Sequence, residues 1–253
     1  MASSNDFQLD GKSAVITGAG SGIGRAIALK FAANGAAVHL FDLNLPQAEA
    51  VASEIKSAGG KATPWLCDVS DQAQTLSTFQ RLVVNERIHI LINNAGVYRF
   101  GATADTDDAF FDEHVNLNLR APYILVQKLV PGMAERGHGA VVNISTLAAS
   151  TPARQAGIYG ATKAGVELLT RVWADEFGPS GVRVNTVAAG PTETPGTAIT
   201  PGLTDGLATT TTLGRVADPD EIARAVTFLA SPDASYINGA ILHATGGQRA
   251  IAP

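Results

Sequence analysis

The chain has 253 residues, 45% of them hydrophobic, and a formal net charge of −5. This length is long for one typical domain and short for two, yet α/β folds of this size often form a single unit. No basic run is present, so neither nucleic acid nor an anionic membrane is an expected partner, and a small-molecule substrate is expected.

The cysteine and histidine content and the N-terminus indicate the expected compartment of the protein and whether a metal site is expected. Cys67 is the only cysteine, which rules out an internal disulfide and fits a reducing compartment. The five histidines are scattered without ligand spacing, so we expect packed or solvated side chains and no catalytic metal. The N-terminus lacks a basic region followed by an apolar core, and no apolar run reaches the length of a membrane span. We therefore expect a cytoplasmic protein.

A glycine-rich turn lies between the first predicted strand, residues 12–17, and the first predicted helix, residues 25–34. Glycines in this context let the backbone close on a pyrophosphate, while N–H groups at the start of the helix face the anion. The candidate cofactor-binding residues of the turn are Gly18, Ser21, Gly22, Ile23 and Gly24. Because the spacing is Gly-x-x-x-Gly-x-Gly rather than Gly-x-Gly-x-x-Gly, a merely flexible turn is the alternative.

The second predicted strand, residues 37–41, is followed by Asp42 and Leu43. Asp42 lies eighteen residues after Gly24. An acidic side chain at this position can accept hydrogen bonds from both hydroxyls of an adenosine ribose. A helix cap or turn carboxylate is the alternative, which the distance from the glycine turn disfavours.

A third strand closes the first half of the predicted sheet. A helix over residues 46–57 leads to this strand at residues 63–67. Asp68 and Val69 follow it, and in a doubly wound sheet they would lie beside the adenine of a dinucleotide.

The fourth predicted strand, residues 88–92, is apolar on both faces, as expected of a central parallel strand. A helix over residues 71–85 precedes it. Asn94, Ala95 and Gly96 follow it, at the end of a central strand where open sheets bind ligands. This position favours a cofactor contact over the alternative of a polar turn.

The remaining elements carry the candidate catalytic residues. A long helical region over residues 107–135 contains Asn116 and Asn118, and Pro122 predicts an irregularity near them. The other predicted elements are a strand over 140–144 ending in Ser145 and Thr146, a helix over 157–177, a strand over 182–187, a helix over 221–230 and a strand over 240–244. Seven strands alternating with helices, without a repeat or linker, predict an α/β fold with one doubly wound parallel sheet.

Tyr159 and Lys163 lie four residues apart in a predicted helix, so the phenol and the ammonium project from the same face. A phenol has a reference pKa of about 10, and lowering it by about 3 units takes about 4 kcal/mol. A lysine cation in a poorly hydrated cleft can supply much of that. The alternative is a packed tyrosine beside a solvated lysine.

The whole chain resembles the classical form of the short-chain dehydrogenase/reductase family. The segments that carry the resemblance occur in order as TGAGSGIG, CDVSD, NNAG, VNLNL, VVNIST, YGATK, VNTVAAGPTETP and GAILHATGG. The resemblance implies one domain over residues 1–253, a Rossmann-type sheet with helices on both faces and a nicotinamide cofactor.

Catalytic roles follow from the same resemblance. Tyr159 matches the acid/base of the family, and Lys163 matches the residue that lowers its pKa and contacts the nicotinamide ribose. Asn118 matches the asparagine that holds a water in a proton relay, with Asn116 as a nearby rival. Thr146, thirteen residues before Tyr159, stands where the family has a substrate-orienting serine. Its hydroxyl offers the same chemistry, and adjacent Ser145 should face the opposite side of the strand.

Two further departures lie near the nicotinamide position. The chain has Ala189-Gly190 where the family usually has Pro-Gly, and Thr245 where aspartate is common. Thr192 and Thr194 keep positions able to hydrogen-bond a carboxamide. We interpret the departures as loop adjustments, since every group needed for hydride transfer remains.

The implied reaction is reversible hydride transfer between a nicotinamide and a secondary alcohol or ketone. NAD is the expected cofactor, because Asp42 would repel a 2′-phosphate and neither Ser21 nor Leu43 is basic. An NADPH-dependent 3-oxoacyl carrier-protein reductase and a catalytically inactive dinucleotide sensor are the alternatives. The resemblance also implies a homotetramer. The apolar residues Val166, Leu169, Trp173 and Phe177 of the Tyr159 helix either contact a partner or pack on their own sheet.

A segment of about residues 191–214 is expected to form a lid over the nicotinamide. Its only charges up to Leu213 are Glu193 and Asp205, so a neutral substrate is expected. Arg154 is the one cation that could change this, although a solvated loop arginine is the alternative. Tyr98 and Phe100 could add aromatic surface to the pocket.

Overall fold

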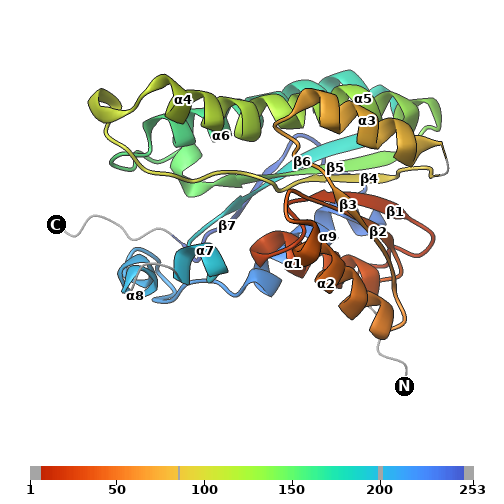
Figure 1. Ribbon diagram of the computed structural model, residues 1–253, viewed down its shortest axis with the longest axis horizontal. Coiled ribbons are helices and arrows are strands. Elements are labelled where there is room, and N and C mark those ends of the chain that lie inside the picture. Colours follow the sequence, from red (N-terminus) through yellow and green to blue (C-terminus); the bar gives the residue numbers. More distant parts are fainter. Residues whose placement is uncertain (1–6, 85, 199–201, 248–253) are drawn as a thin grey trace.

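The computed structural model describes residues 7–84, 86–198 and 202–247 (Figure 1). Within these residues seven strands form one parallel sheet in the order β3-β2-β1-β4-β5-β6-β7. The strands are β1 (Ser13–Thr17), β2 (Ala37–Asp42), β3 (Lys61–Leu66), β4 (Ile90–Asn93), β5 (Gly139–Thr146), β6 (Val182–Ala189) and β7 (Ile241–Ala244). The strand order reverses between β1 and β4, which confirms the predicted doubly wound sheet.

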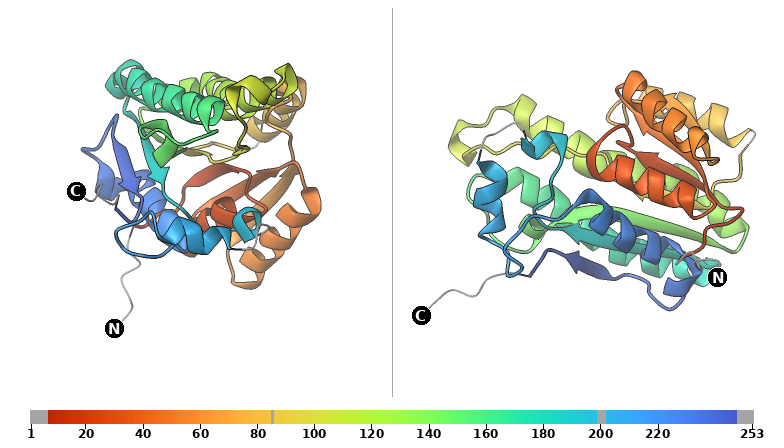
Figure 2. Two further views of the ribbon diagram at one scale, coloured as in Figure 1. Left: turned by 90° about the vertical axis from the view of Figure 1, so that its left-hand side faces the viewer. Right: turned by 90° about the horizontal axis from the view of Figure 1, so that it is seen from below.

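Helices cover both faces of the sheet (Figures 1 and 2). On one face lie α1 (Gly22–Ala33), α2 (Leu45–Ser57) and α9 (Pro219–Ala230), and on the other α3 (Gln72–Val83), α4 (Asp108–Val115), α5 (Ala121–Glu135) and α6 (Gly157–Phe177). The short helices α7 (Pro195–Ala198) and α8 (Leu203–Ala208) lie beyond the strand ends near β7. Single 3-10 turns occur at η1 (Thr103–Asp105), η3 (Leu147–Ala149), η4 (Gly178–Ser180) and η5 (Pro232–Ala234).

Each layer of helices has its own buried core against the sheet. One core joins β1 and β2 to α1, α2 and α9, with Phe31 and Ile27 completely buried. The other joins β4, β5 and β6 to α3, α5 and α6, with Leu125 and Met133 completely buried. The central strand β4 is buried along its full length, as its apolar sequence predicts.

The element boundaries differ from those predicted in two informative places. Helix α1 starts at Gly22 rather than Arg25 because the glycine turn is itself the first helical turn, with Ser21 as the N-cap. The predicted long helix is divided by a π-helical segment, η2 (Asn116–Arg120), which confirms the irregularity near Asn118. Asn85, the last residue of the predicted third helix, lies outside the described residues.

The four apolar residues of α6 named above pack on the protein's own sheet. Val166 and Trp173 are buried, and Leu169 and Phe177 pack against the same core as Trp173. The apolar side chains that α6 exposes are instead Leu168 and Val172. Any partner on this helix would therefore contact a different stripe from the one that the sequence suggested.

Candidate active site

The glycine turn closes tightly on the end of β4. Gly18 and Gly22 have φ values of 63° and 52°, in the left-handed region that favours glycine. A Cβ atom at Gly24 would lie 2.0 Å from the Gly18 carbonyl oxygen and 2.5 Å from Asn94 Nδ2. Glycine is therefore required at this point of α1. Ile23 is partly buried against the core, and Ser21 is exposed at the helix start, where an anion is favoured.

Asp42 ties the glycine turn to β2. One carboxylate oxygen accepts a hydrogen bond from Gly20 N at 2.7 Å, and the other accepts one from Asn44 N at 2.8 Å. Each oxygen retains a further lone pair, so the carboxylate can still accept from ribose hydroxyls. Leu43 beside it is 70% exposed, and Arg25, the first cation of α1 after the glycine turn, pairs with Glu54 at 2.6 Å.

The side chain of Asn94 is used to hold the turn. Its Nδ2 donates to the carbonyl oxygens of Thr17 at 2.8 Å and Gly18 at 3.2 Å. The Thr17 hydroxyl accepts from the backbone N–H groups of Asn94 at 3.0 Å and Ala95 at 2.9 Å. Thr17 is thus a positioning residue that sequence reasoning missed, although its place at the end of β1 was visible.

Asp68 and Val69 lie at the end of β3, on the same side of the sheet order as Asp42. One Asp68 carboxylate oxygen accepts from Ser70 N at 2.9 Å and Ser70 Oγ at 2.6 Å. The Asp68 N–H donates to the Gln74 side chain, and Val69 is buried. This local network holds the segment in a fixed conformation beside the Asp42 loop.

Tyr159 is paired with Thr146 and not with Ser145. Burial raises the pKa of Tyr159 above its ordinary value, a hydrogen bond from the Thr146 side chain opposes that rise, and nearby Tyr98 adds to it. Ser145 instead donates to Glu167 Oε1 at 2.7 Å in the interior. The alternation of strand β5 therefore places the Thr146 hydroxyl on the Tyr159 side.

Lys163 is buried, four residues after Tyr159 on α6. Its Nζ donates to the Ile144 carbonyl oxygen at 2.9 Å, and burial lowers the pKa of Lys163 from 10.5 to about 8. The expectation that Lys163 lowers the pKa of Tyr159 stays a prediction. The ammonium is held by Ile144, and burial of the phenol dominates.

Asn118 sits in the π-helical segment with none of its surface exposed. Its Oδ1 accepts from Val97 N at 2.8 Å, while its Nδ2 donates to Val97 O at 2.8 Å and to Thr162 Oγ1 at 3.3 Å. A Cβ atom at Gly96 would lie 3.0 Å from Asn118 Oδ1 and 3.2 Å from Lys163 Nζ. Gly96, Asn118 and Lys163 therefore converge, whereas Asn116 is only half-buried.

The segment predicted to form a lid begins directly beside the end of β7. Gly190 N donates to Ala244 O at 2.9 Å, and a Cβ atom at Gly190 would lie 2.6 Å from Thr245 Cα. Ala189 and Thr245, which differ from the residues usual in the family, thus lie next to this contact. Thr192 Oγ1 donates to Gly190 O at 2.9 Å.

Thr194 lies over the glycine turn. A Cβ atom at Gly22 would be 3.3 Å from the Thr194 methyl group. Thr194 N donates to Thr197 Oγ1 in α7 at 2.8 Å. Residues 199–201 of the predicted lid lie outside the described residues.

Aromatic side chains surround Tyr159 on its outer side. Phe100 meets its ring edge-on at a centroid distance of 6.1 Å, and His114 does so at 6.5 Å. His114 is completely buried, and its Nδ1 hydrogen-bonds to Phe110 O at 2.8 Å. The expectation of a packed histidine is confirmed, but its place beside Tyr159 had no signal in the sequence.

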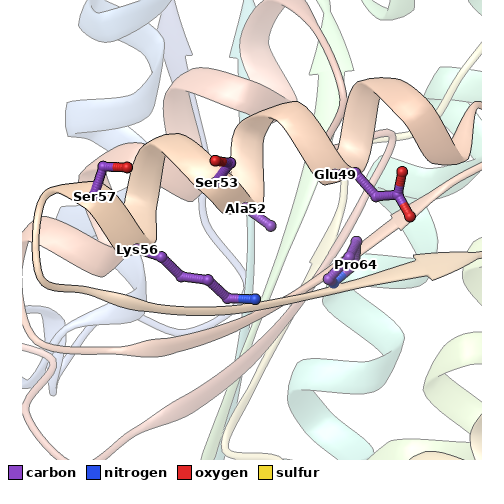
Figure 3. A pocket seen from close by; sticks show the side chains of 6 residues that line it. All are labelled: Glu49, Ala52, Ser53, Lys56, Ser57 and Pro64. Carbon is purple, nitrogen blue, oxygen red and sulfur yellow. The ribbon is translucent and has the colours of Figure 1, made fainter.

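Two surface cavities lie away from this cluster. One, of about 900 Å³, runs from Gly20 and Gly22 along the outer side of α1 toward Glu54 and Asp220. The other is a shallow pocket between α2 and β3, lined by Glu49, Ala52, Ser53, Lys56, Ser57 and Pro64 (Figure 3). Neither of these two cavities is lined by Tyr159. Only the first reaches the glycine turn.

Comparison with known proteins agrees with this arrangement. A family model described as enoyl-(acyl carrier protein) reductase matches residues 18–249. The chain belongs to the short-chain dehydrogenase/reductase family. D-threitol dehydrogenase of Mycolicibacterium smegmatis is 40% identical, over 96% of this chain and 94% of that protein. The 3-oxoacyl-[acyl-carrier-protein] reductase of Thermotoga maritima is 35% identical, over 95% and 99%.

A solved structure extends the comparison to bound ligands. The 7α-hydroxysteroid dehydrogenase complexed with NADH and 7-oxo-glycochenodeoxycholic acid superposes with a TM-score of 0.92, at 34% identity over 98% of both chains. The chain is accordingly an oxidoreductase that uses a nicotinamide dinucleotide. The residues present fit this cofactor, because the glycine turn closes tightly before α1, Ser21 is exposed at the start of that helix, and the Asp42 carboxylate beside the turn can still accept from ribose hydroxyls.

Other kinds of site find no support in the described part of the chain. No group of three or more His, Cys, Asp or Glu side chains there is placed to hold a metal ion. None of the helices in the same residues is long and apolar enough to cross a membrane.

Proposed function

We propose that this protein is an NAD(H)-dependent oxidoreductase that interconverts a neutral secondary alcohol and its ketone. The observation that carries the proposal is the hydrogen bond between Thr146 and Tyr159 above the buried Lys163. Thr146 ends β5, and Tyr159 and Lys163 lie on α6. The glycine turn follows β1 of the same parallel sheet.

Tyr159 is the proton-transferring residue in this proposal. In oxidation Tyr159 acts as a phenolate that takes the hydroxyl proton of the substrate, and in reduction the phenol so formed returns a proton to the carbonyl oxygen. Thr146 orients the reacting oxygen by a second hydrogen bond. A bound nicotinamide dinucleotide supplies the hydride donor or acceptor. Lys163 holds the ribose next to it, and Asn118 fixes the Val97 backbone and supports the water of the proton relay.

The proposed preference for NAD rests on Asp42. Its carboxylate accepts from the glycine turn, where the adenosine ribose binds in Rossmann-type sheets. A 2′-phosphate there would meet an anion, and the nearby Arg25 is already paired with Glu54. The other proposed cofactor contacts are Gly18, Ser21, Gly22, Ile23, Gly24, Leu43, Asp68, Val69, Asn94, Ala95, Gly96, Gly190, Thr192 and Thr194.

A neutral substrate is supported by the charges around the site. Arg154 is exposed, and Arg99 pairs with Glu113 at 2.7 Å while its guanidinium lies over Phe110. Relatives named as threitol and hydroxysteroid dehydrogenases act on alcohols. We also propose a cytoplasmic homotetramer, supported by the exposed apolar side chains Phe111, Tyr123, Leu168 and Val172 on α4, α5 and α6.

The test is an absorbance assay of secondary alcohols and ketones with NAD(H) and NADP(H), run with the Tyr159→Phe variant. We expect turnover with neutral substrates in the wild type. Tyr159→Phe should lower kcat by about a thousandfold and leave dinucleotide affinity within about threefold, since the glycine turn and Asp42 are intact. Turnover near the wild-type rate in the variant would refute the role of Tyr159.

A carrier-protein reductase is the second candidate, favoured by the relative from Thermotoga maritima. It predicts that a 3-oxoacyl thioester with NADPH outperforms every neutral alcohol or ketone. A dinucleotide sensor predicts tight cofactor binding without turnover. The absorbance assay, extended to a 3-oxoacyl thioester and combined with a titration of dinucleotide binding, distinguishes all three.

A further inference from the structure

A second phenol, that of Tyr98, lies close to Tyr159. Tyr98 belongs to the segment that follows β4, and it is 45% exposed. Its hydroxyl lies directly against the backbone of Gly196 in α7, because a Cβ atom at Gly196 would be 1.6 Å from Tyr98 Oη and 2.9 Å from Cζ. Glycine at position 196 therefore makes room for the Tyr98 hydroxyl under the lid.

Tyr98 lies two residues before Phe100, whose ring meets the Tyr159 ring edge-on at a centroid distance of 6.1 Å. Tyr98 is close enough to contribute to the raised pKa of Tyr159. The Tyr159 hydroxyl is joined to Thr146. Among the residues that the structure describes, by contrast, no hydrogen bond holds the Tyr98 hydroxyl, which is both a donor and an acceptor.

The segment that carries Tyr98 is anchored on the same helix as Tyr159. Gly101 N donates to Gln155 O at 2.9 Å, just before α6 begins. Phe100 touches the edge of the Tyr159 ring and is 57% exposed. Arg99 between the two aromatic residues is turned to Glu113. Tyr98 and Phe100 thus offer the pocket a hydroxyl and an apolar ring, and no charge.

We propose that Tyr98 binds a second oxygen of the substrate, so that the preferred substrates are neutral polyols or hydroxy ketones and not simple alcohols. This rests on the proposed alcohol–ketone oxidoreduction and names its substrate class. The reacting oxygen lies between Tyr159 and Thr146, a neighbouring hydroxyl or carbonyl oxygen bonds to Tyr98, and the carbon chain passes Phe100.

The experiment compares kcat/KM for the better of 2,3-butanediol and 1,3-butanediol with kcat/KM for 2-butanol. A site with a hydroxyl placed for a substrate hydroxyl discriminates against the analogue that lacks it. We expect the wild type to prefer the diol by at least about tenfold, which corresponds to about 1.4 kcal/mol. Tyr98→Phe should lower that ratio by about tenfold, with the loss mainly in KM for the diol.

Two further variants separate this role from a general effect on folding. Gly196→Ala keeps Tyr98 but places a methyl group where its hydroxyl lies, so the diol preference should fall by a similar factor. Tyr236→Phe removes a phenol that is fully exposed away from the site and should leave the ratio unchanged. Thermal unfolding of all three variants shows whether the fold is retained.

Three results of this experiment would contradict the role proposed for Tyr98. A wild type that oxidises 2-butanol as well as either diol overturns the inference and leaves the proposed function intact. A diol preference that survives Tyr98→Phe within about twofold also overturns it. Absence of turnover with all three alcohols overturns the proposed function and the inference together.

Discussion

The glycine turn and the pocket around Tyr159 are held together by different kinds of contact. The turn is fixed by backbone groups: Asp42 accepts from Gly20 N, and the Asn94 amide donates to the carbonyls of Thr17 and Gly18. The pocket is formed by side chains from distant segments, such as Phe100 and His114 around Tyr159. Backbone contacts leave a fixed spacing in the sequence, whereas side-chain contacts of this kind do not.

The difference predicts that the turn tolerates substitution far less well than the pocket. Gly24→Ala places a Cβ atom 2.0 Å from the Gly18 carbonyl oxygen, so the turn must open. We expect dinucleotide affinity to fall at least about a hundredfold and the free energy of unfolding to fall by roughly 1–3 kcal/mol. Calorimetric titration with NAD and urea unfolding measure the two effects.

Gly132→Ala in α5 is the matched control, because its Cβ atom would meet only the flexible end of Arg136. It should change neither quantity by more than the helix propensity of alanine predicts. Normal NAD affinity in Gly24→Ala would show that the turn is less tightly closed than these contacts require.

Within the pocket, substitution of Thr146 should mainly lower activity, whereas substitution of Ser145 should mainly lower stability. Thr146→Ala removes a hydrogen bond to the reacting oxygen, and we expect kcat/KM to fall about a hundredfold. Thr146→Ser should recover most of the activity. Ser145→Ala instead leaves the buried Glu167 without its partner, which should cost about 1–3 kcal/mol of stability and less activity. The reverse ranking of activities would assign the catalytic hydroxyl to Ser145.

The position of the Asp42 carboxylate at the glycine turn also predicts how strongly NAD is preferred over NADP. A 2′-phosphate about 4 Å from the carboxylate meets repulsion of up to roughly 4 kcal/mol per charge pair, and half of that already exceeds tenfold. We expect kcat/KM with NAD to exceed that with NADP by more than tenfold. Asp42→Asn should reduce the ratio, since the amide keeps the shape without the charge. Equal specificity constants for the wild type would contradict the assignment.

The features that the sequence predicts differ in the same way from those that it does not predict. The doubly wound parallel sheet, the irregularity near Asn118 and the opposite orientation of Ser145 and Thr146 could be predicted. Strand and helix patterns determine which side chains share a face. The position of Tyr98 against Gly196 could not, since it depends on how a loop after β4 meets a lid almost a hundred residues later. The sequence predicts that Asn94 contacts the cofactor, but not that its side-chain amide holds the glycine turn.

The pKa values of the catalytic pair show why patterns of residues cannot give electrostatics. The spacing of Tyr159 and Lys163 predicts that they share a helix face, but not that the ammonium donates to Ile144. Burial then dominates both groups, raising the pKa of the phenol and lowering that of the ammonium. Depth in the fold, which a single sequence does not contain, decides the direction.

Burial of Lys163 leads to the last prediction, that removing this proposed catalytic residue stabilises the protein. Its pKa is about 8 in the folded protein against 10.5 for the ordinary value, so between these pH values the unfolded chain binds more protons and stability rises with pH. Below pH 8 the whole cost of burying the charge is present, about 3 kcal/mol. Lys163→Met removes this cost and loses one hydrogen bond to Ile144, worth about 1 kcal/mol.

The Lys163→Met variant should therefore be more stable than the wild type by about 2 kcal/mol at pH 7, while turnover is lost. The gain should shrink as the pH rises from 8 toward 10.5, where the lysine is neutral in both states. Urea unfolding of the two proteins at pH 7 and pH 10 measures the difference, and other titrating groups cancel because both proteins share them. If the variant is less stable than the wild type at pH 7, or if its gain in stability does not depend on pH, burial of the Lys163 charge costs little stability.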